Sequence, residues 1–269
     1  MSTRLEIPVF GAASAATAIL AGASRIELNA EGSYADGGLT PRIKDIAQLE
    51  SLVVPVRVMI RPRGPPSSGG LDFVYSRAEL DTMEQAIRDF KASGMMSEPR
   101  GDGFVFGVLN APNAQAVVGT DASRSRHAAI DVDSCRRLVN AARPFKAVFH
   151  RAFDEVVGRA YDADTRALLW ESGLGDLIAV GFDGILTSGG LGNALENVET
   201  LDRIFRKAGD GVEVIIGGGI RSTNVGHIRR TLGLGSGTTT SWMHSSCITV
   251  SGSEQVDGNE VKRILEELR

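Results

Sequence analysis

A histidine, an arginine and an aspartate follow one short apolar run of this chain almost without interruption. The run Lys146–Phe149 ends at His150 and Arg151, and Asp154 comes three residues after the arginine. A run of this kind is typical of a strand buried on both faces. Polar groups at the carboxyl end of such a strand are typical of the binding or catalytic face of an α/β fold. Imidazole transfers protons near neutral pH, and guanidinium binds anions.

Basic side chains and glycines follow other apolar runs in the same way. The run that ends at Ile60 is followed by Arg61 and Arg63, and later runs end in the segments 187–190 and 217–219. Planar guanidinium groups suit carboxylate or phosphate ligands, and glycine lets backbone N–H groups approach an anion closely. We therefore predict an anion site formed by Arg61, Arg63, Arg151, Ser188, Gly218 and Gly219. The alternative is that the glycines only make tight turns between strands and helices.

Two further groups, Glu27 and His244, are candidates for proton transfer. Glu27 lies within a short strand-like run, and His244 ends another. A buried carboxylate must be paired or neutralised, which leaves two interpretations. Glu27 is either part of a salt-bridged layer, with Arg61 or Arg151 as its partner across the barrel, or a general base with a raised pKa. The predicted catalytic residues are Glu27, His150 and His244, with His150 as general acid or base and Glu27 as its counterpart.

Strand-like and helix-like segments alternate along the whole chain, which indicates a parallel sheet. The expected strands are 5–10, 25–28, 56–61, 103–108, 147–150, 184–186, 212–216 and 239–244. The expected helices are 12–21, 43–52, 77–93, 133–142, 162–170, 195–207, 224–232 and 259–268, and a long polar loop is expected over 110–127. This count predicts a single α/β domain over residues 1–269, a (β/α)8 TIM-like barrel. No glycine-rich nucleotide-binding motif follows the first strand, which disfavours an open doubly wound sheet.

The uncharged segment 7–23 has the composition of a signal peptide, but its pattern favours two elements of the barrel. Pro8 and Gly11 divide it into a strand-like piece and a helix-like piece. Proline has no N–H to donate to a neighbouring strand. We therefore expect a local irregularity in the first strand, which should be regular on only one side of Pro8.

Composition narrows the range of partners and compartments. The chain has 269 residues, of which 42% are hydrophobic and 23% charged, enough for one barrel with a large core. A net charge of -4 without a basic stripe predicts no nucleic-acid partner, and no stretch is apolar enough for a membrane span. Two cysteines are too few for a disulfide scaffold, so a cytoplasmic protein is expected.

Several longer motifs run from the first strand to the last helix, and in them the chain resembles the CutC copper-homeostasis family. These motifs are 25–28, 37–41, 58–64, 72–76, 149–154, 186–189 and 217–220. The resemblance implies a TIM-like barrel that is homo-oligomeric, cytosolic and linked to copper handling. It also makes copper the one cofactor to consider.

The chain departs from the family pattern where copper would be held. Many members carry a cysteine in the first strand and another just after the Arg25–Leu28 string, where this chain has Pro8 and Asn29. A His-Cys-Ser string of some members reads His-Ser-Ser at 244–246. Copper(I) prefers thiolate and thioether ligands, so these replacements remove the basis for tight binding there. The remaining thiols, Cys135 in a helix and Cys247 near the last strand, favour a structural role, and we predict no metal ligands.

Three functions follow from these observations. The first is a CutC-like protein of copper homeostasis, whose ligand is a small molecule or a metal ion. The second is a barrel enzyme that acts on a small anionic or phosphorylated substrate, which predicts that phosphate raises the melting temperature through Arg61. The third is a non-catalytic scaffold that uses the same pocket.

Overall fold

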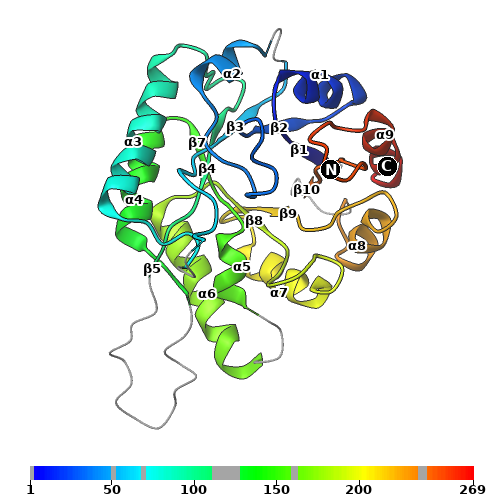
Figure 1. Ribbon diagram of the computed structural model, residues 1–269. Helices are drawn as coiled ribbons and strands as arrows, with labels where there is room; N and C mark the ends of the chain where they lie inside the picture. Colours follow the sequence, from blue (N-terminus) through cyan, green and yellow to red (C-terminus); the bar gives the residue numbers. More distant parts are fainter. Residues whose placement is uncertain (1–2, 50–52, 68–70, 111–127, 159–162, 236–240) are drawn as a thin grey trace.

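Eight parallel strands close into a barrel in the computed structural model, which describes residues 3–49, 53–67, 71–110, 128–158, 163–235 and 241–269 (Figure 1). Around the barrel the strands follow the order β1-β10-β9-β8-β7-β4-β3-β2. Their bounds are β1 Arg4–Val9, β2 Arg25–Leu28, β3 Val56–Met59, β4 Gly103–Phe106, β7 Lys146–Phe149, β8 Gly184–Thr187, β9 Glu213–Ile216 and β10 Trp242–His244. The eight predicted strands and the TIM-like barrel are confirmed.

Helices surround the barrel on its outer side (Figure 1). Those in the described part are α1 Ala12–Ala21, α2 Ile43–Ala47, α3 Arg77–Ala92, α4 Val132–Ala142, α5 Ala152–Val157, α6 Ala163–Val180, α7 Val198–Ala208, α8 Val225–Thr231 and α9 Gly258–Glu267. None of them is long and apolar enough to cross a lipid bilayer. The segment 7–23 forms the end of β1 and the whole of α1, as its pattern predicted.

The helices and strands differ from the predicted elements in three respects. The sequence missed α5 and a small antiparallel pair, β5 (Leu109–Asn110) with β6 (Ala129–Ile130), while 111–127 lie outside the described residues. The helix predicted over 162–170 continues to Val180 through Gly173. A side chain at Gly173 would come within 3.2 Å of Val156, so glycine there permits close packing of α6 on α5. Helix α2 ends at Ala47, before the predicted end at 52.

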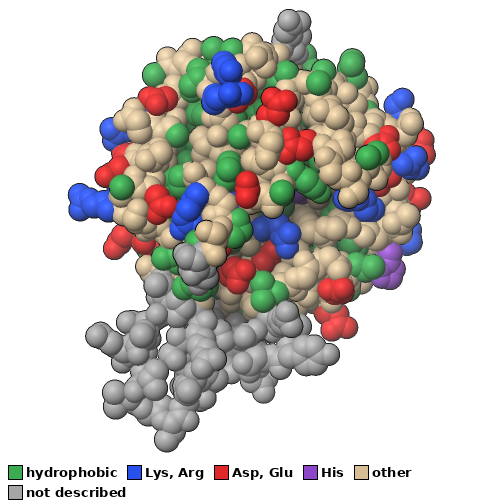
Figure 2. All heavy atoms as spheres, viewed as in Figure 1, with side chains coloured by type: hydrophobic (Ala, Val, Ile, Leu, Met, Phe, Trp, Pro, Cys, Tyr) green, Lys and Arg blue, Asp and Glu red, His purple; other side chains and the backbone are tan. Residues whose placement is uncertain are grey.

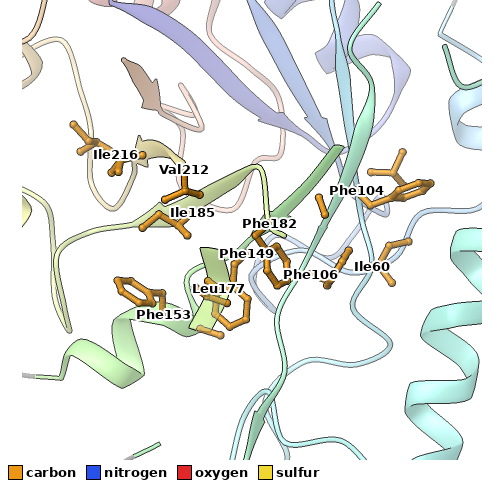
Figure 3. Packing of buried hydrophobic residues seen from close by; sticks show 14 of the residues in the cluster. Ile60, Phe104, Phe106, Phe149, Phe153, Leu177, Phe182, Ile185, Val212 and Ile216 are labelled. Carbon is orange, nitrogen blue, oxygen red and sulfur yellow. The ribbon is translucent and has the colours of Figure 1, made fainter. Parts of the chain in front are cut away.

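The main apolar core lies between the strands and the helices, because side chains alternate between the two faces of each strand. Figure 3 shows its aromatic part, where Phe182 packs against Phe106 and Phe149 with ring centroids 5.3 and 5.4 Å apart. A second, smaller cluster consists of Met59, Val105, Val148, Leu186, Ile215 and Trp242. These residues share the inward register of their strands, so part of the barrel interior is apolar. The remainder is polar and forms the site described below.

Strand β1 is paired differently with its two neighbours. Its ladder with β10 stops at Glu6, whereas its ladder with β2 continues through Val9 and pairs Pro8 with Glu27. The backbone of Glu6 accepts from Ser245 of the β10 side, and that of Val9 accepts from Asn29 of the β2 side. By alternation the missing N–H of Pro8 faces β10, where the ladder has ended. The expected one-sided regularity is confirmed.

Candidate active site in the barrel mouth

A cavity of about 500 Å³ opens at the carboxyl ends of the strands. It is lined by side chains from strands and loops that lie far apart in the sequence. Of the predicted site residues, the lining includes Glu27, Arg61, His150, Arg151, Gly218, Gly219 and His244, but neither Arg63 nor Ser188. Its volume falls within the range of roughly 300–1,000 Å³ that is usual for small-molecule sites. Figure 2 shows basic and acidic side chains close together on the face viewed in Figure 1.

Glu6, which the sequence left without a role, forms the centre of the polar interior. Its carboxylate is buried, accepts a short hydrogen bond from Arg25 Nε and lies 2.7 Å from His244 Nδ1 through Oε1. Arg25 also reaches Glu213 at 2.9 Å and lies with its guanidinium 3.7 Å from the centre of the Trp242 ring. Burial alone would raise the pKa of Glu6, but Arg25 and His244 outweigh it and lower the pKa to about 2. Glu6 is therefore an anion held between Arg25 and His244.

Glu27 lies beside this ion pair and is less completely bound. The side chain is 3% exposed, and Oε1 accepts a hydrogen bond of 3.1 Å from Asn29. Oε2 is buried and has no hydrogen-bond partner among the described residues. Burial, reinforced by the charge of Glu6, raises the pKa of Glu27, although His244 and Asn29 oppose this. The salt bridge to Arg61 or Arg151 considered from the sequence does not form, and Glu27 keeps a carboxyl oxygen free.

His244 completes a group of three titratable side chains. One ligand atom each of Glu6, Glu27 and His244 lie within 4.8 Å of one another. Burial alone would lower the pKa of His244, but the hydrogen bond to Glu6 and the charge of Glu27 raise it above the usual value. Two adjacent carboxyls with pKa values moved in opposite directions are typical of a site with one anion and one acid or base. In this pair the carboxyl with the lowered pKa is Glu6, and the one with the raised pKa is Glu27.

His150 lies in a different electrostatic environment. It is 4% exposed, its Nδ1 accepts a hydrogen bond of 3.2 Å from the Ala152 N–H, and Phe73 packs on its ring at 4.7 Å. Nδ1 is thus the acceptor nitrogen, and the proton of the neutral ring is on Nε2, which has no partner in the described structure. Burial, together with the positive charge of Arg61, lowers the pKa of His150 to about 3. This arrangement favours hydrogen-bond donation over the acid–base role that the sequence suggested.

The arginines predicted to bind an anion are mostly bound to the protein itself. Arg61 is buried, donates to the carbonyls of Asp36 and Gly38 and forms an ion pair of 2.9 Å with Asp72. Arg63 lies outside the cavity lining and pairs with Glu79 at 2.6 Å. Asp72 and Glu79, which lie eleven and sixteen residues further along the chain, therefore neutralise these two cations. Arg61 and Arg63 hold the loops of the mouth together in this structure.

Arg151 and Ser188 belong to a network centred on Asp154. Arg151 Nε donates to Asp154 at 2.8 Å, and the hydroxyls of Thr187 and Ser188 donate to the same carboxylate at 2.6 and 2.8 Å. Ser188 also receives a hydrogen bond of 2.9 Å from Arg151. This network joins the end of β8 to the start of α5. The Ser188 hydroxyl is therefore already hydrogen-bonded within the protein, which disfavours a role as an anion ligand. Arg151 already has Asp154 as an acidic partner.

Arg221 is a lining residue that the sequence reasoning missed. It follows the glycine triplet by two residues, which was the available signal. Its guanidinium donates to the Ile220 carbonyl at 2.7 Å and lies 3.4 Å from the hydroxyls of Ser245 and Ser246. No carboxylate of the described residues lies within 4.0 Å of it. Arg221 is therefore a cation of the mouth without an acidic partner in that part of the chain.

The sulfur atoms are poorly placed to hold copper. Cys135 is buried in α4 against the Val108 carbonyl, and burial raises its pKa to about 12. Cys247 is also buried, with its pKa raised to about 11, and neither thiol lines the cavity. Within the described residues, Glu6, Glu27 and His244 are the one group with metal-ligand spacing. It offers hard oxygen and imidazole ligands, and Arg25 already supplies the cation there. The residues present do not fit a tight Cu(I) site.

Comparison with known proteins places these features in a family. A CutC family model matches residues 3–246. The human copper homeostasis protein cutC homolog is 34% identical over 225 residues, which covers 83% of this chain and 68% of the human protein. A CutC family protein of Porphyromonas gingivalis is 32% identical over 235 residues, covering 87% and 79% of the two chains. The crystal structure of a copper homeostasis protein CutC from Streptococcus agalactiae has a TM-score of 0.68 at 24% identity and covers 91% of this chain and 99% of its own. The last likeness supports the fold alone.

Proposed function

This chain belongs to the CutC family, and we propose that its barrel mouth is an enzyme site that binds a small oxygen-rich anion and transfers a proton on it. The observation that carries this proposal is a pair of residues on one cavity. Glu27 and His150 both line it, and each has a buried polar atom without a partner in the described structure. Burial disfavours the charged form of both side chains. Such pairs with shifted pKa values are typical of acid–base sites.

The two residues suit different halves of one reaction. Glu27 in its ionised form, whose raised pKa makes it the stronger base, takes a proton from a carbon next to a carbonyl group and later gives a proton back to that carbon. As the C–H bond breaks, its electron pair moves toward the carbonyl oxygen. The neutral His150 donates its Nε2–H to that oxygen and stabilises the negative charge that develops there. The positioning residues are Glu6, Arg25 and His244, whose ion pairs set the electrostatic environment of Glu27.

In this proposal the link to copper is indirect. It runs through the organic ligand of the mouth, and the chain does not bind copper through thiols. The human relative is named for copper homeostasis. Both cysteines of this chain are buried away from the cavity, and Asn29 donates to Glu27 where many members have a thiol. We propose that any part this chain takes in copper homeostasis depends on the organic ligand of the mouth. Loss of the Glu27 function should then produce the same copper phenotype as deletion of the chain.

Location and assembly are proposed from the chemistry of the cysteines and from the family resemblance. Two buried, unpaired thiols support a reducing compartment, and we propose the cytoplasm. The family resemblance supports a homo-oligomer, which light scattering of the purified protein would test. The net charge of -4 supports a small-molecule partner over nucleic acid.

Hydrogen–deuterium exchange tests the proposed reaction without knowledge of the natural substrate. The protein is incubated in D2O with a panel of small hydroxyaldehydes, hydroxyketones and their phosphates, and carbon-bound deuterium is followed by NMR. We expect exchange with at least one compound, its loss in Glu27→Gln and a strong decrease in His150→Phe. Glu199→Gln, on the exposed face of α7, is the matched control and should behave as wild type. Equal exchange in wild type and Glu27→Gln would refute the assignment.

A further inference from the structure

We infer that the mouth contains a phosphate recess formed by Gly218, Gly219, Arg221 and Ser246, so that the substrate of the proposed enzyme is a phosphate monoester. This inference rests on the proposed function and specifies its substrate class. All four residues line the cavity. They lie on the segments that follow β9 and β10, the seventh and eighth strands of the barrel. Barrels frequently bind phosphate with the loops that follow these two strands.

The barrel brings the two segments together. Strands β9 and β10 are hydrogen-bonded neighbours, with Ile216 opposite Met243, so the residues that follow them emerge side by side. Arg221 joins the segments because its guanidinium lies 3.4 Å from Ser245 Oγ and from Ser246 Oγ. Gly217, which precedes the recess, is close to His244, since a Cβ built on Gly217 would be 3.5 Å from His244 Cβ. The recess therefore adjoins the titratable group of Glu6, Glu27 and His244.

The glycines supply backbone donors that the protein does not use. No hydrogen bond joins the N–H of Gly218 or Gly219 to a described residue. Their φ angles are +91° and +75°, a conformation that residues with a side chain rarely adopt. A Cβ at Gly218 would be 2.6 Å from Ser188 Cβ, so the position excludes a side chain in any case. Successive free amides in such a turn form a concave surface that suits an anion.

Charge distinguishes Arg221 from the other arginines of the cavity. Arg61 is paired with Asp72 and Arg151 with Asp154, whereas no described carboxylate lies within 4.0 Å of Arg221. Glu260, the acidic residue packed behind this loop, is held by Ser222 and by Arg263 at 2.9 Å. Arg221 is thus free to offset the charge of a dianion. An arginine, two amides and a hydroxyl line the same part of the cavity, and this number of donors suits the three terminal oxygens of phosphate better than the two of a carboxylate.

Titration with inorganic phosphate, followed by ¹⁵N NMR and calorimetry, tests the recess directly. We expect saturable shifts of the Gly218 and Gly219 amide signals, with binding weakened about tenfold or more in Arg221→Met, because charge-assisted hydrogen bonds are lost. Ser246→Ala should weaken binding by a smaller factor and serves as the second variant if Arg221→Met is poorly folded. Arg206→Met, whose side chain is 78% exposed on α7, is the matched control. Succinate at equal concentration should bind more weakly than phosphate.

Each outcome bears on the inference in a defined way. No binding, equal binding of succinate, or binding that Arg221→Met and Ser246→Ala leave unchanged would overturn the phosphate recess. The same measurements in Glu27→Gln should give wild-type phosphate affinity, because Glu27 is assigned to the proton and not to the phosphate. Exchange on unphosphorylated compounds without phosphate binding would overturn the recess and leave the proposed enzyme intact. Phosphate binding without exchange on any compound would support the recess and count against the proposed enzyme.

Discussion

The two histidines of the cavity both lie at strand ends of the same barrel, yet their surroundings shift their pKa values in opposite directions. On the wall formed by β10, β1 and β2, His244 contacts the anionic Glu6 at 2.7 Å, and its pKa is raised. On the wall formed by β3 and β7, His150 receives a backbone N–H and faces Arg61, and its pKa is lowered to about 3. On the first wall the surroundings favour the protonated form of His244. On the second wall they favour the neutral form of His150, which can still donate a hydrogen bond. Position at a strand end does not determine the role of a histidine; its partners do.

The carboxyls of the first wall show the same principle. Glu6 and Glu27 enter from adjacent strands and share His244 as a neighbour, but only Glu6 contacts Arg25 directly. One carboxyl is therefore kept ionised, and the other is pushed toward its protonated form. The second wall has no such pair, because Arg61 is neutralised by Asp72 in the loop after β3. In the proposed reaction the acid–base wall takes up the proton and the donor wall binds the carbonyl oxygen, so the proposal requires both walls.

The largest expected effect comes from breaking the ion pair of the acid–base wall. In Glu6→Gln, the buried Arg25 loses its main anionic partner and His244 its hydrogen-bonded carboxylate. Removal of one member of a buried pair leaves an uncompensated charge and usually costs about 3–5 kcal/mol of unfolding free energy. Urea denaturation at pH 7 measures this loss. Glu213→Gln, which removes the more exposed second partner of Arg25, is the control and should cost clearly less.

The pH dependence of that loss gives an independent check. The folded-state pKa of Glu6 is lowered from 4.5 to about 2, so its contribution to stability is present above pH 4.5 and disappears as the pH falls toward 2. Wild type should therefore lose stability in this window, and Glu6→Gln should lose much less of it. Parallel curves for the two proteins would show that Glu6 is not the anion of this wall.

The donor wall should lose stability when its buried arginine is removed. Arg61→Ala leaves Asp72 and the carbonyls of Asp36 and Gly38 without their donor, and we expect a cost of about 2–3 kcal/mol. Arg63→Ala is the matched control, since Arg63 is 29% exposed and its ion pair should contribute only about 1 kcal/mol. A larger loss for Arg63 than for Arg61 would contradict this description of the mouth.

The barrel could be predicted from sequence because each strand has its own local signal. Short apolar runs separated by amphipathic segments indicate the number of strands and the alternation of strands with helices. Because active sites of such barrels lie at the carboxyl ends of the strands, Glu27, His150 and His244 were expected to share one site, and all three line the cavity. What the sequence did not reveal is which charges neutralise one another. Arg61 was predicted as an anion ligand although Asp72, eleven residues later, already binds it, and the free cation Arg221 was overlooked. Such pairings depend on loop geometry, which the pattern of single segments does not encode.

Opposite pH slopes should separate the two histidines. The pKa of His150 is lowered from 6.5 to about 3, so wild type loses stability as the pH falls below 6.5; the part lost by pH 5 should be about 1–2 kcal/mol. His150→Gln keeps an acceptor for the Ala152 N–H and should abolish this part. For His244 the pKa is raised, so its contribution is present below pH 6.5 and is lost as the pH rises through the folded pKa. His244→Gln should therefore flatten the alkaline side of the curve. If the contributions of His150 and His244 to stability changed with pH in the same direction, the contrast between the two walls would be wrong.

The smallest expected effect is that of copper on the acid–base wall of the reduced protein. The family resemblance implies thiols at the positions of Pro8 and Asn29, and both cysteines of this chain are buried outside the cavity lining. We expect the chain to compete poorly with a strong Cu(I) chelator, and joint substitution of Cys135 and Cys247 to change this little. A tight stoichiometric complex that Cys247→Ser abolishes would overturn the prediction. The Pro8→Cys, Asn29→Cys double variant sharpens it, because Pro8 is paired with Glu27 across β1 and β2 and Asn29 contacts Glu27, so the variant adds two soft ligands beside Glu27. Gain of Cu(I) affinity in that variant alone would show that missing thiols, and not the barrel itself, keep copper from this wall.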